Sequence, residues 1–371
     1  MHLICKACPN GCALQLTRSD DTTVLVRGNH CARGVAYAYA EKKEEWPGQF
    51  LPAEQPERYS REALLPVLKA WGLPLERIDP NALIQGSPER SAFRVVVADS
   101  QGKSYLLETV LPYSCDRRKR IAACLRRLRE KALPVIPYAP GLDGDFVQHV
   151  AGKYWQLSDF VAGEALDRTA YWRDGWRGAA LADFLADLSA NTLGDAWSAG
   201  PAFSLPAYID RLLQTISSHR PQLLGELGDV VAFLKRELYP IYDSIPQRFS
   251  HGDPHPMNVL WGADRIRAVI DWEFSGLRPL VYDAALVLGC VGAEAPGALD
   301  GAFLEAFRLR LRERGVFAPE FYDRLPLFTL AQRFAWLSEW LRRNDVEMIE
   351  FECFYMNLLR RRIDDASVPL P

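Results

Sequence analysis

Two short apolar runs in the second half of the chain, residues 259–261 and 266–270, are flanked by side chains that carry oxygen atoms. Asn258 directly precedes the first run, and Asp271 directly follows the second. The start of one antiparallel strand lies beside the end of its partner, so a hairpin here brings Asn258 and Asp271 together, with Asp253 on the adjoining loop. Amide and carboxylate oxygens with space left for other ligands are what magnesium requires. The spacing therefore predicts a magnesium site, and the alternative is an Asx-rich loop that only caps turns.

Four more polar residues lie close to these three in the sequence. His251 is expected to support the loop through hydrogen bonds. For His255, a supporting role and a role in proton transfer are equally open. Glu273 either reaches a second metal ion or, as we favour, forms a structural salt bridge. Asp283 begins an apolar helical run, and we expect it to cap that helix and to buttress the site.

The stretches His-Gly-Asp-Pro-His-Pro-Met-Asn (251–258) and Ile-Asp-Trp-Glu (270–273) resemble the motifs of the aminoglycoside phosphotransferase and choline kinase-like family. The resemblance spans roughly residues 60–365. It implies ATP as phosphoryl donor and a small hydroxyl-bearing molecule as acceptor, as in aminoglycoside, choline and homoserine kinases. It also implies that Asp253 orients the acceptor hydroxyl and can accept its proton. Asn258 and Asp271 would hold the Mg²⁺ that bridges the nucleotide phosphates.

The order of the expected elements agrees with this family's fold. Alternating apolar residues predict strands at 92–97, 104–110, 146–149 and 155–160. Helical periodicity predicts helices at 62–71, 116–131, 302–314, 326–343 and 346–364, with others between residues 174 and 241. Strands that precede helices favour an α+β, two-lobed protein-kinase-like fold, with a β-rich N-lobe over 61–160 and a helical C-lobe over 161–371.

The acceptor pocket is expected between the catalytic loop and the helices after residue 165. Acidic residues near the end of the chain, Glu339 and Glu352 among them, could attract a cationic amino alcohol there. The alternative is that they are ordinary surface charge.

The nucleotide lobe departs from the family pattern. That pattern has a flexible loop, a strand lysine for the phosphates and an acidic partner on the next helix. Gly86 and Ser87 are candidates for the loop, although a plain turn is the alternative. Glu108 stands where the lysine is expected, and Lys103 lies too early, in a hairpin turn.

The helix after Glu108 is correspondingly basic. One hypothesis is an ion pair of reversed polarity, in which Glu108 binds Arg117 or Arg120 and the arginine faces the phosphates. The alternative is a solvated basic face. Main-chain groups of Asp159 and Val161 are expected to contact adenine, unless this segment is an ordinary buried strand. The missing lysine keeps open a nucleotide-binding pseudokinase or regulatory module.

Four of the eight cysteines, Cys5, Cys8, Cys12 and Cys31, lie in the first 31 residues. In a reducing compartment such a cluster indicates a metal site. The run resembles the [4Fe–4S]-binding start of molybdopterin oxidoreductases, while Zn²⁺ or uncoordinated cysteines remain alternatives. We expect a four-cysteine module over 1–45 with a hairpin around residues 19–21, and a Pro-rich linker over 46–60. A cluster in such a module would imply a redox partner.

The composition restricts the class of protein. Apolar residues make up 49% and charged residues 25% of the 371 residues, which is typical of a folded protein with two or three domains. A net charge of −3 gives no reason to expect nucleic acid as a partner. No apolar run approaches the roughly 20 residues of a membrane span, and no signal peptide is recognisable. We therefore expect a cytoplasmic protein without a membrane partner.

Overall fold

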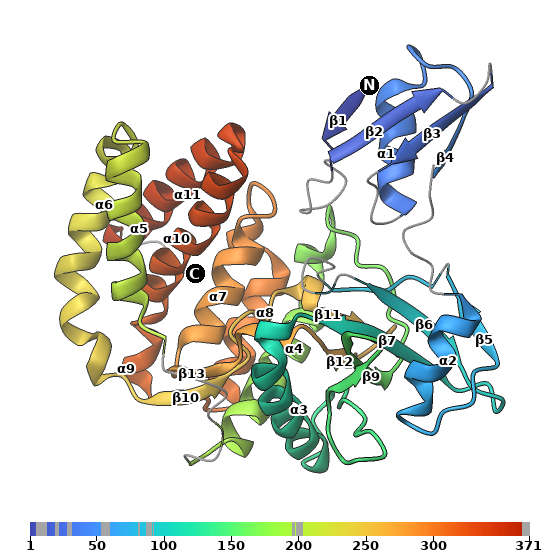
Figure 1. Cartoon of the computed structure of the whole chain (residues 1–371). Coiled ribbons are helices and arrows are strands. Elements are labelled where there is room, and N and C mark those ends of the chain that lie inside the picture. Colours follow the sequence, from blue (N-terminus) through green and yellow to red (C-terminus); the bar gives the residue numbers. More distant parts are fainter. Residues whose placement is uncertain are drawn as a thin grey trace.

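The chain builds a small N-terminal sheet, a second sheet and a large helical body, as the computed structural model in Figure 1 shows. The structure describes residues 1–4, 13–18, 22–27, 32–52, 60–80, 82–86, 91, 93–194, 197 and 203–365. Sheet-rich segments precede helical ones along the chain, which confirms the α+β, kinase-like architecture.

The N-terminal module is a four-stranded sheet covered by one helix over its described residues. The strands, in spatial order, are β1 (His2–Ile4), β2 (Ala13–Arg18), β3 (Thr23–Arg27) and β4 (Gln49–Pro52), and the helix is α1 (Ala32–Lys42). Strands β2 and β3 are antiparallel, so the predicted hairpin is confirmed, although its turn lies outside the described residues. Alternate side chains form a core of the module's own: Leu14, Leu16, Val24, Val26, Ala38 and Phe50.

The start of the predicted linker is wrong, because β4 lies within it. Strand β4 pairs in parallel with β3, and the Gln49 amide donates to the Thr22 carbonyl at 2.7 Å. Gly48 has φ +136°, and a Cβ there would come within 2.4 Å of the Thr22 oxygen. The glycine thus permits a close approach between two backbones inside the module, which extends to residue 52.

The N-lobe is an antiparallel sheet in the order β5 (Arg77–Asp79), β6 (Arg94–Ala98), β7 (Ser104–Val110), β9 (Lys153–Asp159) and β8 (Gln148–Val150). Successive side chains of a strand face opposite sides. On one side Val95, Val97, Leu107 and Leu157 pack against α2 (Arg61–Lys69). The other side faces the helical body, and α3 (Cys115–Glu130) follows β7. The strands and helices predicted for this lobe are confirmed to within a few residues.

The C-lobe is helical with two short strand pairs. Its helices are α4 (Gly175–Asn191), α5 (Leu205–His219), α6 (Leu223–Glu237), α7 (Tyr282–Gly292), α8 (Ala302–Glu313), α9 (Pro319–Tyr322), α10 (Leu325–Arg343) and α11 (Val346–Asp364). Strand β11 (Val259–Trp261) pairs with β12 (Ile266–Val269), and β10 (Gln247–Ser250) pairs with β13 (Gly276–Pro279). Every residue of α7 is buried, so this helix is the centre of the lobe. The helices predicted over 302–364 are confirmed.

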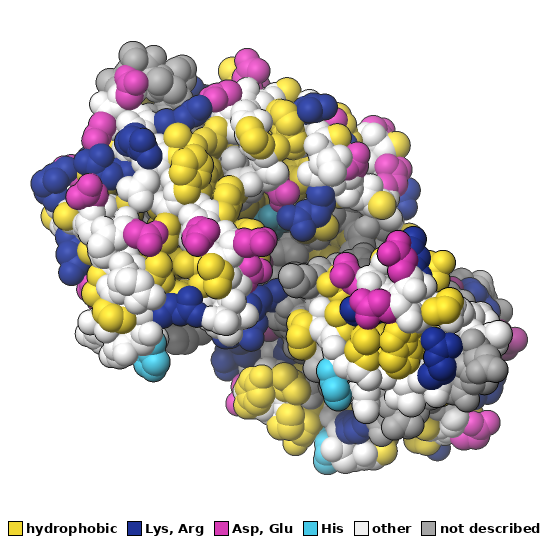
Figure 2. Space-filling model, turned by 90° about the horizontal axis from the view of Figure 1, so that it is seen from above, with side chains coloured by type: hydrophobic (Ala, Val, Ile, Leu, Met, Phe, Trp, Pro, Cys, Tyr) yellow, Lys and Arg dark blue, Asp and Glu magenta, His cyan; other side chains and the backbone are white. Residues whose placement is uncertain are grey.

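The surface carries mixed charge. On the face seen in Figure 2, basic and acidic side chains are interspersed among apolar ones over the helical half. Among the helices of the described segments, none is both long and apolar enough to cross a membrane.

Candidate active site

The hairpin of β11 and β12 brings the expected magnesium ligands together. Val259 is in register with Val269, and the Ile270 amide donates to the Asn258 carbonyl at 2.9 Å. Asn258 and Asp271 therefore stand side by side at the open end of the hairpin, as the sequence predicted. Asp271 has φ 70° and ψ 52°, the left-handed conformation, between β12 and the short 3-10 turn Trp272–Phe274.

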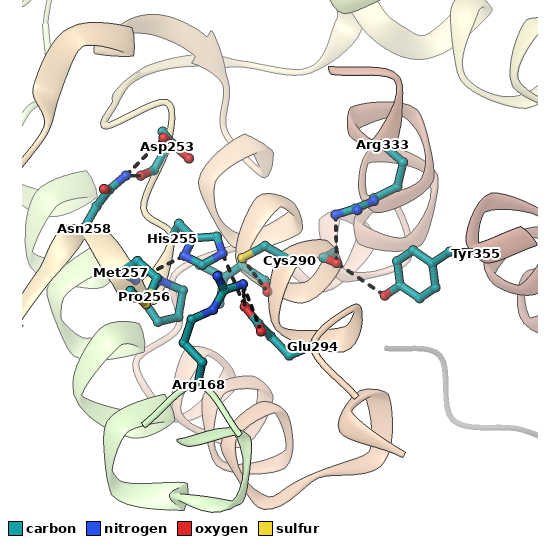
Figure 3. Close-up of polar contacts among 12 residues, drawn as sticks. Arg168, Asp253, His255, Pro256, Met257, Asn258, Cys290, Glu294, Arg333 and Tyr355 are labelled. Atoms are coloured by element: carbon teal, nitrogen blue, oxygen red, sulfur yellow. Dashed lines mark hydrogen bonds and ion pairs between the residues drawn. The ribbon is translucent and has the colours of Figure 1, made fainter. Parts of the chain in front are cut away.

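Asp253 and Asn258 are joined directly. The Asn258 amide nitrogen, Nδ2, donates to the Asp253 carboxylate at 3.0 Å and to the Asp253 carbonyl at 2.9 Å. Figure 3 shows the two side chains facing each other. Because Nδ2 makes both bonds, the amide oxygen of Asn258 is the atom suited to a cation. Asn258 is buried whereas Asp253 is half-buried, so the carboxylate remains accessible to a substrate.

His251 holds the loop in place through both ring nitrogens. Its Nδ1 accepts the backbone N–H of Asp253 at 3.1 Å, so its Nε2 carries the proton and donates to the Ile270 carbonyl at 2.9 Å. The ring also lies 4.5 Å from the Trp272 ring. These contacts agree with the supporting role that we expected for His251.

Asp283 buttresses the catalytic loop from α7. Its carboxylate accepts the backbone N–H groups of His251 at 2.7 Å and Gly252 at 2.9 Å. The expected helix cap is wrong, because Asp283 lies inside the first turn of α7 and Val281 occupies the cap position. Burial raises the pKa of Asp283 to about 6, while the two N–H donors act in the opposite direction.

His255 lies between the Asp253–Asn258 pair and an ion pair of Arg168 with Glu294 (Figure 3). Its Nδ1 accepts the Met257 N–H at 3.1 Å and caps a 3-10 turn. Burial and nearby arginines lower the pKa of His255 to about 3, so the ring is neutral at neutral pH. Its 3.7 Å approach to Glu294 is therefore a polar contact without a charge on the ring. These contacts favour a supporting role.

A cleft with about 860 Å³ of empty space, part of it open to solvent, lies between the five-stranded sheet and the C-lobe. Four residues expected to bind the nucleotide line it together, Gly86, Glu108, Asp159 and Val161, and the expected magnesium ligand Asp271 and Glu273 line it too. Gly86 has φ +87°, which favours glycine, whereas Ser87 lies outside the described residues. The Asp159 side chain forms an ion pair with Lys103 at 2.9 Å.

The reversed ion pair exists, but its basic partner is Arg118. The Arg118 guanidinium lies 3.1 Å from the Glu108 carboxylate and 2.9 Å from the Glu273 carboxylate. Tyr138 donates to Glu108 and accepts from Arg118. Glu108 and Arg118 are almost fully buried. The salt bridge favoured for Glu273 is therefore observed.

The two arginines proposed as partners of Glu108 lie elsewhere. Arg117 donates to the backbone carbonyls of Glu273 and Ser275. Arg120 is exposed and does not line the cleft within the described part of the chain.

Helix phase explains the difference. The buried stripe Ile121, Leu125 and Leu128 extends by one turn toward the N-terminus to residue 118, three positions before Ile121. That extension was the signal in the sequence for Arg118.

The four N-terminal cysteines, Cys5, Cys8, Cys12 and Cys31, lie outside the described residues. Within the described ranges no group of three or more His, Cys, Asp or Glu side chains is arranged to hold a metal ion. Two of the acidic residues expected near the acceptor are neutralised by arginines. Glu352 is fully buried in an ion pair with Arg333, and Glu339 pairs with Arg342 and Arg343.

The two-lobed fold with a cleft between its lobes is that of the kinase-like class. The model of the family described as "Phosphotransferase enzyme family" matches residues 87–325. The chain belongs to this family, which confirms the predicted resemblance and makes it a small-molecule kinase by class. No curated protein matches the chain.

Solved structures share the fold at low sequence identity. A microcompartment-associated aminopropanol kinase has a TM-score of 0.61 and 18% identity, over 82% of this chain and 98% of its own. Amicoumacin kinase hAmiN, in complex with AMP-PNP, Ca²⁺ and Ami, has a TM-score of 0.59 and 16% identity, over 84% and 95%. The GDP complex of aminoglycoside 2'-phosphotransferase-IIIa has a TM-score of 0.56 and 18% identity, over 81% and 98%. At these identities the similarity establishes the fold alone.

Proposed function

We propose that this chain transfers the γ-phosphoryl group of ATP, with Mg²⁺, to a hydroxyl group of a small molecule. One observation carries the proposal: Asn258 is hydrogen-bonded to Asp253, and the hairpin sets it beside Asp271, which lines the cleft between the lobes. Family membership supplies the reaction class, and the arrangement of side chains supports the division of roles given below.

Asp253 is the residue that we assign to the acceptor. Its carboxylate is held by Asn258 at 3.0 Å and its backbone N–H by His251 at 3.1 Å, so its position is fixed before substrate arrives. It would orient the acceptor hydroxyl toward the γ-phosphorus and accept its proton. The bond from the γ-phosphorus to the bridging oxygen of ADP breaks as the bond to the acceptor oxygen forms.

The residues at the hairpin end fit a magnesium ion. Asn258 offers an amide oxygen and Asp271 a carboxylate, and both are hard ligands of the kind that Mg²⁺ prefers. When bound, Mg²⁺ would neutralise part of the charge on the nucleotide phosphates. The backbone of Asp159 and Val161 is the proposed contact for adenine, at the edge of the cleft.

The acceptor is proposed to enter on the side of His255, Arg168 and Glu294 (Figure 3). His255 is neutral, and Glu294 is paired with Arg168 at 3.2 Å. This side therefore offers both hydrogen-bond donors and hydrogen-bond acceptors. Such a surface fits a small polar alcohol. It does not favour a purely cationic one.

The test is ADP release measured across a panel of amino alcohols, sugars and aminoglycosides. We expect Asp253→Asn to lower kcat by at least about 100-fold with at least one acceptor, because it removes the proton acceptor while keeping the Asn258 contact. Asp264→Asn, in the exposed turn of the same hairpin, is the matched control and should behave as wild type. Equal rates for wild type and Asp253→Asn would refute the enzymatic assignment.

A second candidate is a nucleotide-binding module without turnover, a pseudokinase regulated by the N-terminal module, and Glu108 is the observation that favours it. A carboxylate stands where the family pattern has a lysine, and Arg118 is held between Glu108 and Glu273. Wild-type protein that binds Mg·ADP but transfers phosphate to no acceptor in the panel would support this candidate over the enzyme.

We also propose a metal site at Cys5, Cys8, Cys12 and Cys31, either a [4Fe–4S] cluster or Zn²⁺. The support is their spacing, and the module would gain stability from a metal because its core is small. Anaerobic purification followed by optical and EPR spectra and metal analysis distinguishes the two. Zinc at full occupancy without iron would exclude the cluster, and with it the reason to expect a redox partner.

A further inference from the structure

The cleft-facing side of the N-lobe sheet carries an arginine on the strand next to Glu108. Val95 and Val97 of β6 pack on the α2 side, so Arg94 points to the opposite side, into the cleft. Arg94 is also in direct register with Glu108 of β7. The two side chains therefore lie next to each other on the same face of the sheet.

Of the described basic side chains that line the cleft, Arg94 is the one available to bind a phosphate. Arg94 and Arg118 are the basic residues among the described lining of the cleft. Arg118 is occupied by Glu108, Glu273 and Tyr138. No ion pair with a carboxylate is observed for Arg94 within the described part of the chain.

The present contacts of Arg94 are weak and replaceable. Its Nη1 lies 3.4 Å from the Gln85 carbonyl and its Nη2 lies 3.5 Å from the Ile84 carbonyl, both beyond the usual N–H···O range of about 2.7–3.2 Å. Burial lowers the pKa of Arg94 and Glu108 raises it, but a guanidinium stays protonated at neutral pH.

The position of the guanidinium is next to the expected phosphate site. A Cβ built on Gly86 would lie 3.8 Å from Arg94 Nη1 and 3.1 Å from Cδ1 of Ile270. Ile270 directly precedes Asp271, the proposed magnesium ligand. Gly86 thus lies next to both the Arg94 guanidinium and the end of the hairpin.

We propose that Arg94 binds the nucleotide phosphates and replaces the lysine that this chain lacks on β7. The cation has moved to the neighbouring strand, and the Glu108–Arg118–Glu273 cluster fixes the sheet to α3 without contacting phosphate. A guanidinium can bind two phosphate oxygens at once, which suits it to this task. The proposal rests on the proposed function, since it assumes that the cleft holds a nucleotide.

The experiment compares nucleotide affinities by calorimetry with Mg·ADP and with adenosine. We expect Arg94→Gln to weaken Mg·ADP binding by about 10- to 100-fold and to leave adenosine binding within about twofold, because only the phosphate contact is lost. Arg94→Lys should recover part of the Mg·ADP affinity. Arg77→Gln, at an exposed position on β5, is the matched control and should bind both ligands as wild type does.

The outcomes separate this proposal from the proposed function. Wild type that binds Mg·ADP, together with an equal affinity in Arg94→Gln, overturns the role of Arg94 and leaves the proposed function standing. Wild type that binds neither ligand overturns both. Equal losses for Mg·ADP and adenosine overturn the phosphate contact, because they indicate a structural effect on the whole cleft. Melting curves show whether each variant is folded. If Arg94→Gln does not fold, Arg94→Lys is compared with wild type instead.

Discussion

Asp283 carries a charge into the most buried helix of the protein. It accepts two backbone N–H groups from the catalytic loop, and it lies on α7, where every residue is buried. Burial alone would favour the protonated acid, whereas the two donors favour the carboxylate. The position of the catalytic loop is thus linked to the ionisation of a residue that touches neither substrate nor metal.

This residue predicts a pH dependence of stability. The pKa of Asp283 is about 6 in the folded protein against a usual 3.8, so between these values the folded state holds the proton more tightly than the unfolded chain. Its contribution to the free energy of unfolding is therefore full below pH 4 and falls as the pH rises to 6, by about 3 kcal/mol at most.

Asp283→Asn resembles the protonated acid and should remove this dependence. We expect the stability of the variant relative to wild type to increase as the pH rises from 4 to 6, as measured by denaturant unfolding at each pH. Asp264→Asn, in an exposed turn, is the control for general charge effects. A constant difference over this range would show that Asp283 is ionised throughout.

At the scale of elements, α3 and the five-stranded sheet are joined by the buried cluster of Glu108, Arg118, Glu273 and Tyr138. Arg118 forms ion pairs with carboxylates from a strand of the N-lobe and from the end of the C-lobe hairpin. The cluster therefore connects three elements whose relative positions shape the cleft. Breaking a buried charge pair is costly because it leaves an uncompensated charge.

Exchanging the polarity of Glu108 and Arg118 tests this connection. We expect Glu108→Lys with Arg118→Glu to be less stable than wild type by about 3 kcal/mol, because the new carboxylate at position 118 would face Glu273. Adding Glu273→Gln should restore part of the loss, as measured by denaturant unfolding. If the double variant alone had the same free energy of unfolding as wild type, the contact with Glu273 would contribute little to stability.

Much of this arrangement could be predicted from the sequence, and what could not has a physical cause. The hairpin that unites Asn258 and Asp271 follows from two apolar runs around a turn, which is local information. To predict the role of Arg118, one must know which face of its helix is buried. To predict the position of Arg94, one must know the pairing register of two strands. Both features depend on tertiary contacts. The prolines predicted a linker from residue 46, whereas Gly48 allows a close backbone contact that the sequence does not reveal.

The whole molecule has three hydrophobic cores over its described residues, and they do not coincide with the predicted domains. The core of the N-terminal module and the core between α2 and the five-stranded sheet are small. The third core combines the C-lobe with Ile121, Leu125 and Leu128 of α3, so this N-lobe helix packs as part of the C-lobe. The predicted domain boundary near residue 160 therefore does not separate two hydrophobic cores, because α3 packs into the core of the C-lobe.

Separate cores predict that the N-terminal module melts independently. We expect Cys5→Ser to lose metal and to lower the melting temperature of this module only, while Mg·ADP raises the melting temperature of the remaining chain as in wild type. Calorimetry with and without nucleotide measures both effects. Cys115→Ser, outside the module, is the control.

A different result would be informative about regulation. If Cys5→Ser abolished the effect of Mg·ADP, the module would control the nucleotide site and the two parts would not be independent.

Asp271 ends β12 in a left-handed conformation that costs a residue with a Cβ about 1–2 kcal/mol. Glycine would relieve that strain, but it would also remove the carboxylate proposed to bind magnesium. Selection for stability and selection for chemistry thus oppose each other at this single position. A sequence evolving without need of the reaction would be expected to drift toward glycine here, so retention of aspartate at 271 among close homologues would itself be a record of catalytic use.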